Sequence, residues 1–300
     1  MAAGRGVGTV KISLALIALL AGLPGVEIQQ ATRPLFRSGI EIVRLDVSVT
    51  RNGVPVRGLT ARDFVVTDNG VQQEVDTAAL DQLPLSVQLV LDTSGSDSGL
   101  RLNRLIAAGD GLLSSLRPGE RAGLVTFSED VRVRVGTTTD LVAVRRALGG
   151  IVGSGQTALR DAVQLAIGLR LDDGARPLML VFTDGIDNAS WLADETVLES
   201  AREAGIVTHM VRVSSLEISQ SRFLEQLAEA TGGRIWSASS DRELAQLFTK
   251  ALDEMRGRYL LTLTPRGVTG DGWHELKVKL RDARGDVVAR QGYFRAASPR

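Results

Sequence analysis

The sequence contains no cysteine, and this absence excludes several classes of protein at once. Without cysteine no disulfide can form, and a lipid anchor attached to an N-terminal cysteine is excluded. Only two histidines are present, His209 and His274. Neither a zinc hydrolase site nor a cysteine nucleophile can therefore be assembled from this chain. Secreted animal modules of this size usually carry disulfides, whereas bacterial envelope proteins need not.

Aromatic residues are scarce, and neither sign of charge is in excess. Aromatic side chains make up 4% of the chain, which argues against a surface that stacks on sugars or nucleic-acid bases. The 35 basic residues balance the 35 acidic ones, so we expect no nucleic-acid partner. Hydrophobic residues make up 44% of the 300 residues, which is enough to bury one or two sizeable cores.

The N-terminal segment carries a continuous apolar run. Arg5 and Lys11 precede about a dozen mostly apolar residues, 12–23, which is the length of a signal-peptide core and short for a membrane-spanning helix. Residues 24–27 offer no clear Ala-x-Ala cleavage site. We therefore expect residues 1–30 to form a secretory signal peptide or an N-terminal anchor, and the protein to be secreted or periplasmic. Contact with a membrane is expected only through this segment, if it is uncleaved.

Alternating apolar residues predict β-strands at both ends of the remaining chain. Residues 36–82 alternate in this way, and Asn52-Gly53 is a hairpin turn signal among them. Residues 257–296 show the same pattern, with strands expected at 259–263, 275–280 and 287–294. Neither segment is large enough to form a stable core alone. We therefore predict that the two segments pack together as one small β-sandwich.

Between these segments, residues 83–256 alternate strands and helices. Helical periods separate apolar runs that predict strands at 87–91, 122–127, 178–182, 206–213 and 234–237. Such alternation is typical of a doubly wound, mostly parallel sheet. Residues 131–135 alternate and follow the preceding strand after a tight turn, so we expect an antiparallel edge strand there. The predicted fold class is α/β, with a Rossmann-like domain inserted in the β-sandwich.

Oxygen-bearing side chains lie where three of these segments meet the expected edge of the sheet. Asp92, Ser94 and Ser96 follow one apolar run, Thr157 follows a glycine-rich turn, and Asp184 follows a second apolar run. Ligands of open α/β sheets bind at the carboxyl ends of the strands. Carboxylate and hydroxyl oxygens are hard donors suited to Mg²⁺ or Ca²⁺. We therefore predict that these five residues bind a metal, and we expect no catalytic residue and no organic cofactor.

The combination of Asp-x-Ser-x-Ser, then Thr, then Thr-Asp-Gly resembles the metal-ion-dependent adhesion site of the von Willebrand factor A domain. The resemblance implies that the hydroxyls of Ser94, Ser96 and Thr157 contact Mg²⁺, Mn²⁺ or Ca²⁺ directly. It implies that Asp92 and Asp184 act largely through water. It also implies a non-enzymatic module for adhesion or assembly, in which a carboxylate of a protein ligand completes the metal shell. The strands at both ends resemble a group of secreted bacterial proteins related to this family.

Two other interpretations of the same residues stay open. In a phosphatase of the haloacid-dehalogenase type, Asp92 would be the nucleophile, and Asp184 with Asp187 would hold Mg²⁺. That chemistry wants a second acid two residues after the nucleophile, where Ser94 stands. In a metal-free structural scaffold, the same side chains would cap helices and turns. Asp187 is in addition a secondary candidate for metal contact, with a role as a turn cap at least as well supported.

Overall fold

A computed structural model describes residues 42–80, 83–95, 98–171, 173–183, 187–213, 222–282 and 285–295. All of them belong to one compact unit, residues 40–300. Among the described residues, none of the helices combines the length and the apolar character needed to cross a bilayer. The leader expected over residues 1–30 lies outside the described residues and stays a prediction, as do the predicted domain boundaries.

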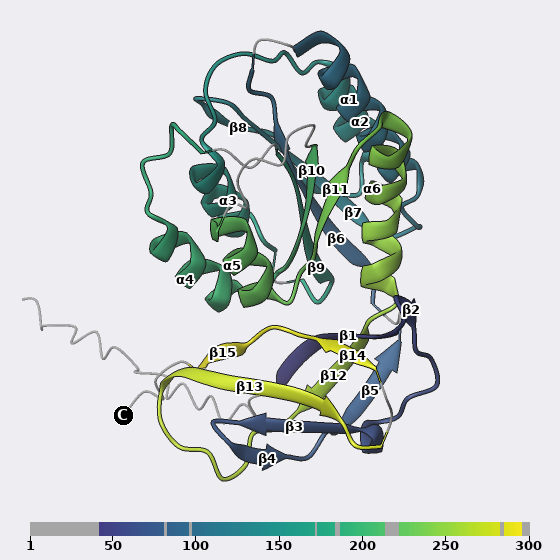
Figure 1. Cartoon of the computed structure of the whole chain (residues 1–300), viewed down its shortest axis with the longest axis vertical. Coiled ribbons are helices and arrows are strands. Elements are labelled where there is room, and N and C mark those ends of the chain that lie inside the picture. The colour runs from purple at the N-terminus through teal and green to yellow at the C-terminus, as the bar shows by residue number, and fades with distance from the viewer. Residues whose placement is uncertain are drawn as a thin grey trace, which may run out of the picture. The chain divides into compact units, whose positions relative to one another are not determined.

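The α/β part is built on a six-stranded sheet (Figure 1). Its strands, in spatial order, are β11 (Ile235–Ala238), β10 (Val207–Val213), β9 (Arg176–Thr183), β6 (Leu85–Asp92), β7 (Arg121–Phe127) and β8 (Val131–Thr138). The neighbours pair in parallel except β8, which pairs antiparallel with β7 at the edge, as its alternation predicted. From β6 the chain adds strands first on one side and then on the other. The carboxyl ends of β6 and β9 therefore flank the switch point of the sheet, where ligands bind in such folds.

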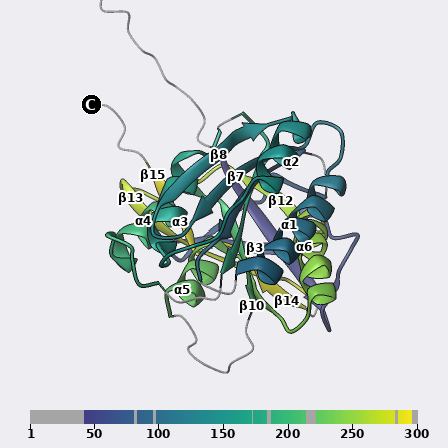
Figure 2. The same ribbon diagram turned by 90° about the horizontal axis from the view of Figure 1, so that it is seen from above.

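Helices cover both faces of this sheet (Figure 2). One face carries α1 (Ser98–Ser114), α2 (Leu141–Gly149) and α6 (Asp241–Arg256), and the other carries α3 (Leu159–Gly168), α4 (Asp194–Ala204) and α5 (Arg222–Thr231). In β6, Leu89 and Leu91 belong to the first core, whereas Val90 between them belongs to the second. A strand buried on both faces reads as a continuous apolar run. The central strands were recognisable in the sequence for this reason.

The β part is a sandwich of two sheets that draw on both ends of the chain (Figure 1). One sheet has the order β14 (Asp286–Val288), β1 (Val43–Arg51), β12 (Tyr259–Leu263) and β5 (Thr77–Leu80), with β2 (Val54–Pro55) paired to β1. The other has the order β15 (Gly292–Arg295), β13 (Gly272–Leu280), β3 (Phe64–Asp68) and β4 (Val71–Gln73), and a short helical turn, Ala61–Asp63, precedes β3. Because β1 lies between two strands from the C-terminal segment, neither segment completes its sheet alone.

Two tight turns shape the N-terminal half of the sandwich. Asn52 and Gly53 join β1 to β2 with φ of 51° and 76°, and Asn69 and Gly70 join β3 to β4 with φ of 46° and 84°. Positive φ at both central residues defines the hairpin turn whose twist matches that of the strands it joins. The Asn-Gly pairs therefore set the register of these two hairpins.

The sandwich core contains the alternate residues of β1. Val43, Leu45, Val47 and Val49 are buried there, together with partners from the C-terminal strands such as Leu261. Their burial removes apolar surface from water at a gain of about 25 cal/mol for each Å². The N-terminal and C-terminal strands thus share one core.

The structure corrects the strand expected at residues 287–294, which is two strands. β14 pairs with β1, and β15 pairs with β13, which lies in the opposite sheet. Strands of a sandwich that switch sheets must bend between them, and here residues 289–291 make that crossing. Val287, Ala289 and Tyr293 nevertheless contact the same core, so the apolar pattern continues across the break.

The α/β part leaves and rejoins the sandwich at adjacent strands. β5 precedes β6 in the chain, and α6 returns the chain to β12. β12 and β5 pair antiparallel, with Tyr259 opposite Leu80. The predicted fold class, a doubly wound and mostly parallel sheet inserted in a β-sandwich, is confirmed.

Candidate functional site

Asp92 is the last residue of β6, and its two carboxylate oxygens face different groups. Oδ1 accepts hydrogen bonds from the backbone N–H of Ser94 at 2.9 Å and from the Ser94 hydroxyl at 2.6 Å. Oδ2 accepts a bond from the Thr183 hydroxyl at 2.9 Å. Asp92 is 2% exposed. The carboxylate is therefore held in one orientation at the switch point of the sheet.

The glycine-rich turn brings Thr157 to the same place. Its hydroxyl donates to the Ser94 Oγ at 2.8 Å. Backbone bonds join the two loops, because Ser154 N donates to the carbonyl oxygen of Thr93 and Gly95 N to that of Gly155. Gly155 has φ of 83°, which L side chains rarely adopt, and an added Cβ would lie 3.0 Å from the Glu129 carboxylate. Only glycine fits this approach without strain.

The oxygens of Asp92, Ser94 and Thr157 have the spacing of metal ligands. Oδ1 of Asp92 lies 2.6 Å from the Ser94 Oγ, which lies 2.8 Å from the Thr157 Oγ1. Adjacent oxygens of an octahedral Mg²⁺ shell are about 2.9 Å apart, since Mg–O distances are about 2.0–2.1 Å. One carboxylate and two hydroxyls are also hard donors. These residues therefore fit a divalent cation such as Mg²⁺ or Mn²⁺.

Two of the five predicted ligands, Ser96 and Asp184, lie outside the described residues. Within the part of the chain that is described, no group of at least three His, Cys, Asp or Glu residues could hold a metal ion. The site depends instead on hydroxyl groups around one described carboxylate. That these residues bind a metal stays a prediction.

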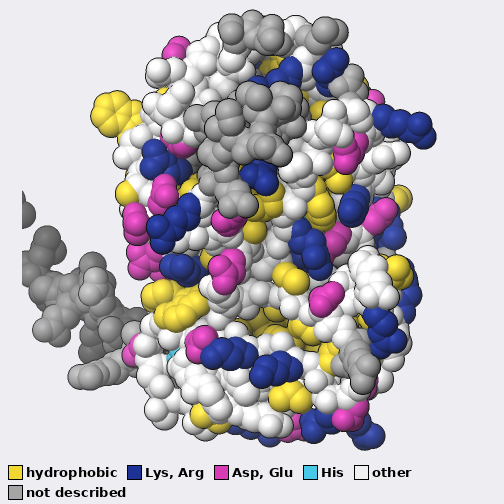
Figure 3. Space-filling view, viewed as in Figure 1, with side chains coloured by type: hydrophobic (Ala, Val, Ile, Leu, Met, Phe, Trp, Pro, Cys, Tyr) yellow, Lys and Arg dark blue, Asp and Glu magenta, His cyan; other side chains and the backbone are white. Residues whose placement is uncertain are grey.

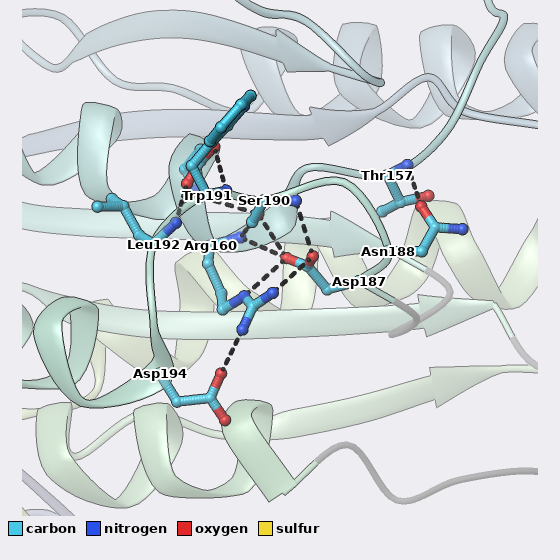
Figure 4. A network of polar contacts seen from close by, with 9 residues as sticks. Thr157, Arg160, Asp187, Asn188, Ser190, Trp191, Leu192 and Asp194 are labelled. Carbon is cyan, nitrogen blue, oxygen red and sulfur yellow. Dashed lines mark hydrogen bonds and ion pairs between the residues drawn. The ribbon is translucent and has the colours of Figure 1, made fainter.

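Asp187, the secondary candidate for metal contact, anchors its own loop (Figure 4). Its carboxylate accepts bonds from the Ser190 hydroxyl at 2.6 Å and from the Arg160 guanidinium at 3.2 Å. Burial raises the pKa of Asp187, but the hydrogen bonds from Ser190 and Arg160 outweigh it and hold the pKa below its ordinary value. Asn188 in the same loop accepts a bond from the backbone N–H of Thr157 at 2.8 Å. The loop thereby fixes the backbone of Thr157.

The same loop presents Trp191 to solvent. Its side chain is 95% exposed, while the backbone N–H groups of Trp191 and Leu192 donate to the Asp161 carboxylate at 3.0 Å each (Figure 4). Asp161 lies in the first turn of α3. A large apolar side chain is therefore held outward on an anchored backbone.

Two residues that contact Asp92 were not predicted from the sequence. Thr183, the last residue of β9, orients Oδ2 of Asp92. Arg101 on α1 has its Nη2 atom 3.9 Å from Oδ2, and its guanidinium lies over the Phe182 ring at 5.8 Å from the centroid. Thr183 stood in the motif but was not assigned a role. Arg101 carried no signal, because an arginine in an amphipathic helix is typical of a solvent-exposed face.

Neither histidine belongs to this site. His209 lies in β10 beside Glu254, with Nε2 2.8 Å from the carboxylate. His274 in β13 lies in the sandwich, where its Nδ1 is 2.8 Å from the Asp68 carboxylate. Both are fully or almost fully buried. They are core residues of their own domains.

The surface shows no concentration of one sign of charge on the face seen in Figure 3. Lys and Arg side chains are interspersed there with Asp and Glu side chains. This distribution agrees with the balance of 35 basic and 35 acidic residues in the sequence. A partner of this face would be recognised by individual side chains rather than by a strong electrostatic potential over the whole face.

Residues 87–186 match the family model described as von Willebrand factor type A domain. The matched stretch contains β6, the Thr157 turn and β9, the segments that meet at the candidate site. The resemblance inferred from the motif is therefore confirmed over residues 87–186.

Similar proteins come from different organisms. The chain is 25% identical to human inter-alpha-trypsin inhibitor heavy chain H4 over 200 residues, which cover 62% of this chain and 21% of the human protein. It is 24% identical to a UPF0353 protein of Mycolicibacterium vanbaalenii over 200 residues, covering 56% of this chain and 60% of that one. The chain thus spans about a fifth of the human relative and three fifths of the mycobacterial one.

A solved structure supports the same fold over a longer stretch. The von Willebrand factor type A protein from Catenulispora acidiphila has a TM-score of 0.51 and 15% identity, and the match covers 86% of this chain and 76% of that one. This share exceeds what the α/β part alone can supply. The likeness therefore extends into the sandwich, and at this identity it concerns the fold only.

Proposed function

We propose that this protein is an extracytoplasmic, divalent-metal-dependent protein-binding module that acts in adhesion or assembly rather than in catalysis. Asp92, Ser94, Ser96, Thr157 and Asp184 would hold Mg²⁺, Mn²⁺ or Ca²⁺. The bound cation supplies a coordination position that a carboxylate of another protein can complete. The observation that supports this proposal most is the ligand-like spacing of the Asp92, Ser94 and Thr157 oxygens.

The chain's own residues favour an anionic ligand from outside. The hydroxyls of Ser94 and Thr157 are neutral, so they leave most of a cation's charge unneutralised. The Asp92 carboxylate already accepts three hydrogen bonds, from Ser94 and Thr183. A carboxylate of a partner would therefore make a strong charge-assisted contact here.

Trp191 gives the proposed interface an apolar contact. It lies three residues beyond Asn188, which binds the backbone of Thr157. Exposed tryptophans on preorganised backbone lose little entropy on binding and are enriched among residues that dominate interface energies. We therefore expect the partner to offer an acidic side chain beside an apolar surface.

Two further parts of the proposal come from the sequence. The apolar run at residues 12–23 supports export from the cytoplasm. Against a haloacid-dehalogenase-like phosphatase stands Ser94, whose hydroxyl donates to Asp92 where a general acid would be needed. A metal-free scaffold is the remaining alternative, and it predicts indifference to chelators.

Affinity capture from an envelope extract tests this proposal. The wild-type protein should capture a partner in Mg²⁺ and release it in EDTA, because the partner's carboxylate needs the cation. Asp92→Ala should lose the capture. Asp286→Ala, the same change at an exposed position in β14 of the sandwich, should keep it. A partner that binds equally in EDTA and to Asp92→Ala would contradict the proposal.

A further inference from the structure

We propose that Arg101 is a resident counter-cation of the metal centre: it neutralises Asp92 in the metal-free protein and lowers the affinity of the site for divalent cations. This inference rests on the proposed function, because it assigns a role at the same site. Arg101 would lower the metal affinity of this site and add positive charge to the metal-bound surface.

The two oxygens of Asp92 divide its charge between two directions. Oδ1 accepts a hydrogen bond from the Ser94 hydroxyl, which in turn accepts one from the Thr157 hydroxyl. Oδ2 faces the Thr183 hydroxyl at 2.9 Å and the Arg101 guanidinium at 3.9 Å. A cation held by the hydroxyls would therefore compete with the Arg101 guanidinium for the charge of one carboxylate, each near a different oxygen.

The surroundings keep the guanidinium at this position. Arg101 lies in α1, the helix that follows the Asp-x-Ser-x-Ser segment. Its guanidinium carbon lies over the ring of Phe182, a buried residue of β9, at 5.8 Å from the centroid. Its side chain is 28% exposed, so solvent screens it only in part. A cation over an aromatic face is favoured by the ring's quadrupole.

The energetic consequence follows from Coulomb's law. A guanidinium beside Asp92 stabilises the carboxylate when no metal is bound and repels a divalent cation when one arrives. For a unit charge and a divalent ion separated by roughly 6 Å, even bulk water leaves a repulsion equivalent to about a tenfold change in the binding constant. We therefore expect a moderate metal affinity rather than a tight one.

The same charge shapes the ligand that the metal-bound site accepts. With Arg101 present, the occupied site carries one more positive charge than the ligands alone would give it. An anionic partner group gains from this charge, whereas a neutral one does not. Arg101 thus lowers the affinity of the site for the metal and raises the preference of the metal-bound site for acidic ligands.

Titration with Mn²⁺ alone tests the inference on the full chain. Arg101→Gln removes the charge and should bind Mn²⁺ about tenfold more tightly than wild type in calorimetry. In EDTA the same variant should unfold at a lower urea concentration than wild type, and saturating Mn²⁺ should close that gap. Arg101→Lys keeps the charge and should bind Mn²⁺ with nearly wild-type affinity.

Controls separate this role from a merely structural one. Arg101→Met keeps an apolar contact on Phe182 without the charge, so it should reproduce the tighter binding if Arg101→Gln does not fold. Arg146→Gln makes the same change in net charge on the exposed face of α2 and should leave Mn²⁺ affinity unchanged. Wild-type affinity or weaker binding in both charge-free variants would overturn the inference. A folded wild-type protein that binds no Mn²⁺ would overturn the metal site itself, and this inference with it.

Discussion

His209 lies in the middle of β10 with a polar group close to each ring nitrogen. Nδ1 accepts the backbone N–H of Arg234 at 3.1 Å, so the ring proton belongs on Nε2, which lies 2.8 Å from the Glu254 carboxylate. Burial lowers the pKa of His209, and the Glu254 carboxylate offsets this only in part. Burial also raises the pKa of Glu254, but the charge of Arg258 and the contact with His209 outweigh it and lower that pKa. The folded protein therefore holds a neutral imidazole beside an ionised carboxylate.

This arrangement predicts a loss of stability in acid. Because the pKa of His209 is lower in the folded protein than its ordinary value of 6.5, the unfolded chain binds the proton more strongly. The free energy of unfolding should then fall as the pH drops below 6.5. His209→Gln keeps an amide donor for Glu254 and does not titrate, so it should lose less stability than wild type between about pH 7 and about pH 5. Urea unfolding at both pH values measures this, and equal losses would contradict the assignment.

Among the helices and strands, the sequence predicted those whose apolar residues follow a regular period. Continuous apolar runs marked strands buried on two faces, such as β6, and alternation marked β1 and the edge strand β8. The break between β14 and β15 could not be predicted, because it depends on which sheet each piece pairs with.

The candidate site was predictable in the same limited way. The ends of β6 and β9 were recognisable from where their apolar runs stop, and the glycine-rich turn marked Thr157, which was enough to bring Asp92 and Thr157 into one prediction. Arg101 contacts Asp92 from the next helix, and Asn188 contacts Thr157 at a sequence separation of 31 residues. Such contacts depend on how α1 and the loop after β9 pack, which no local pattern encodes.

The shared sandwich makes a prediction about truncation. Deleting residues 257–300 removes β12 and β14, between which β1 lies. The buried faces of Val47 and Val49 would then be exposed, and residues 36–82 should become sensitive to protease. Leu261→Ala, which removes only one buried side chain, should cost about 2–5 kcal/mol and leave the segment resistant. Limited proteolysis with mass spectrometry measures both, and a truncated protein with residues 36–82 still resistant would show that the two β segments are independent.

Within residues 40–300, the candidate site lies at one end of the strands of the six-stranded sheet. The contacts between the α/β part and the sandwich lie at the other end. Asp92 is the last residue of β6, whereas Arg176 is the first of β9 and pairs with the start of β6. Arg176 is 2.6 Å from the Asp46 carboxylate of β1 and donates to the carbonyl oxygen of Met255 in α6. This largely buried ion pair joins the α/β part to the sandwich. The proposed metal site therefore lies at the end of the sheet that is farther from the sandwich.

Direct titration tests whether Asp92, Ser94 and Thr157 belong to a divalent-metal site. Calorimetry with Mg²⁺ and with Mn²⁺ should give saturable binding to the wild-type protein, and excess metal should raise its melting temperature above that in EDTA by mass action. Asp92→Ala should show neither effect, whereas Asp187→Ala, which disturbs only the supporting loop, should bind the metal more weakly than wild type but still measurably. No binding heat, together with equal melting temperatures in EDTA and in excess metal, would contradict the account.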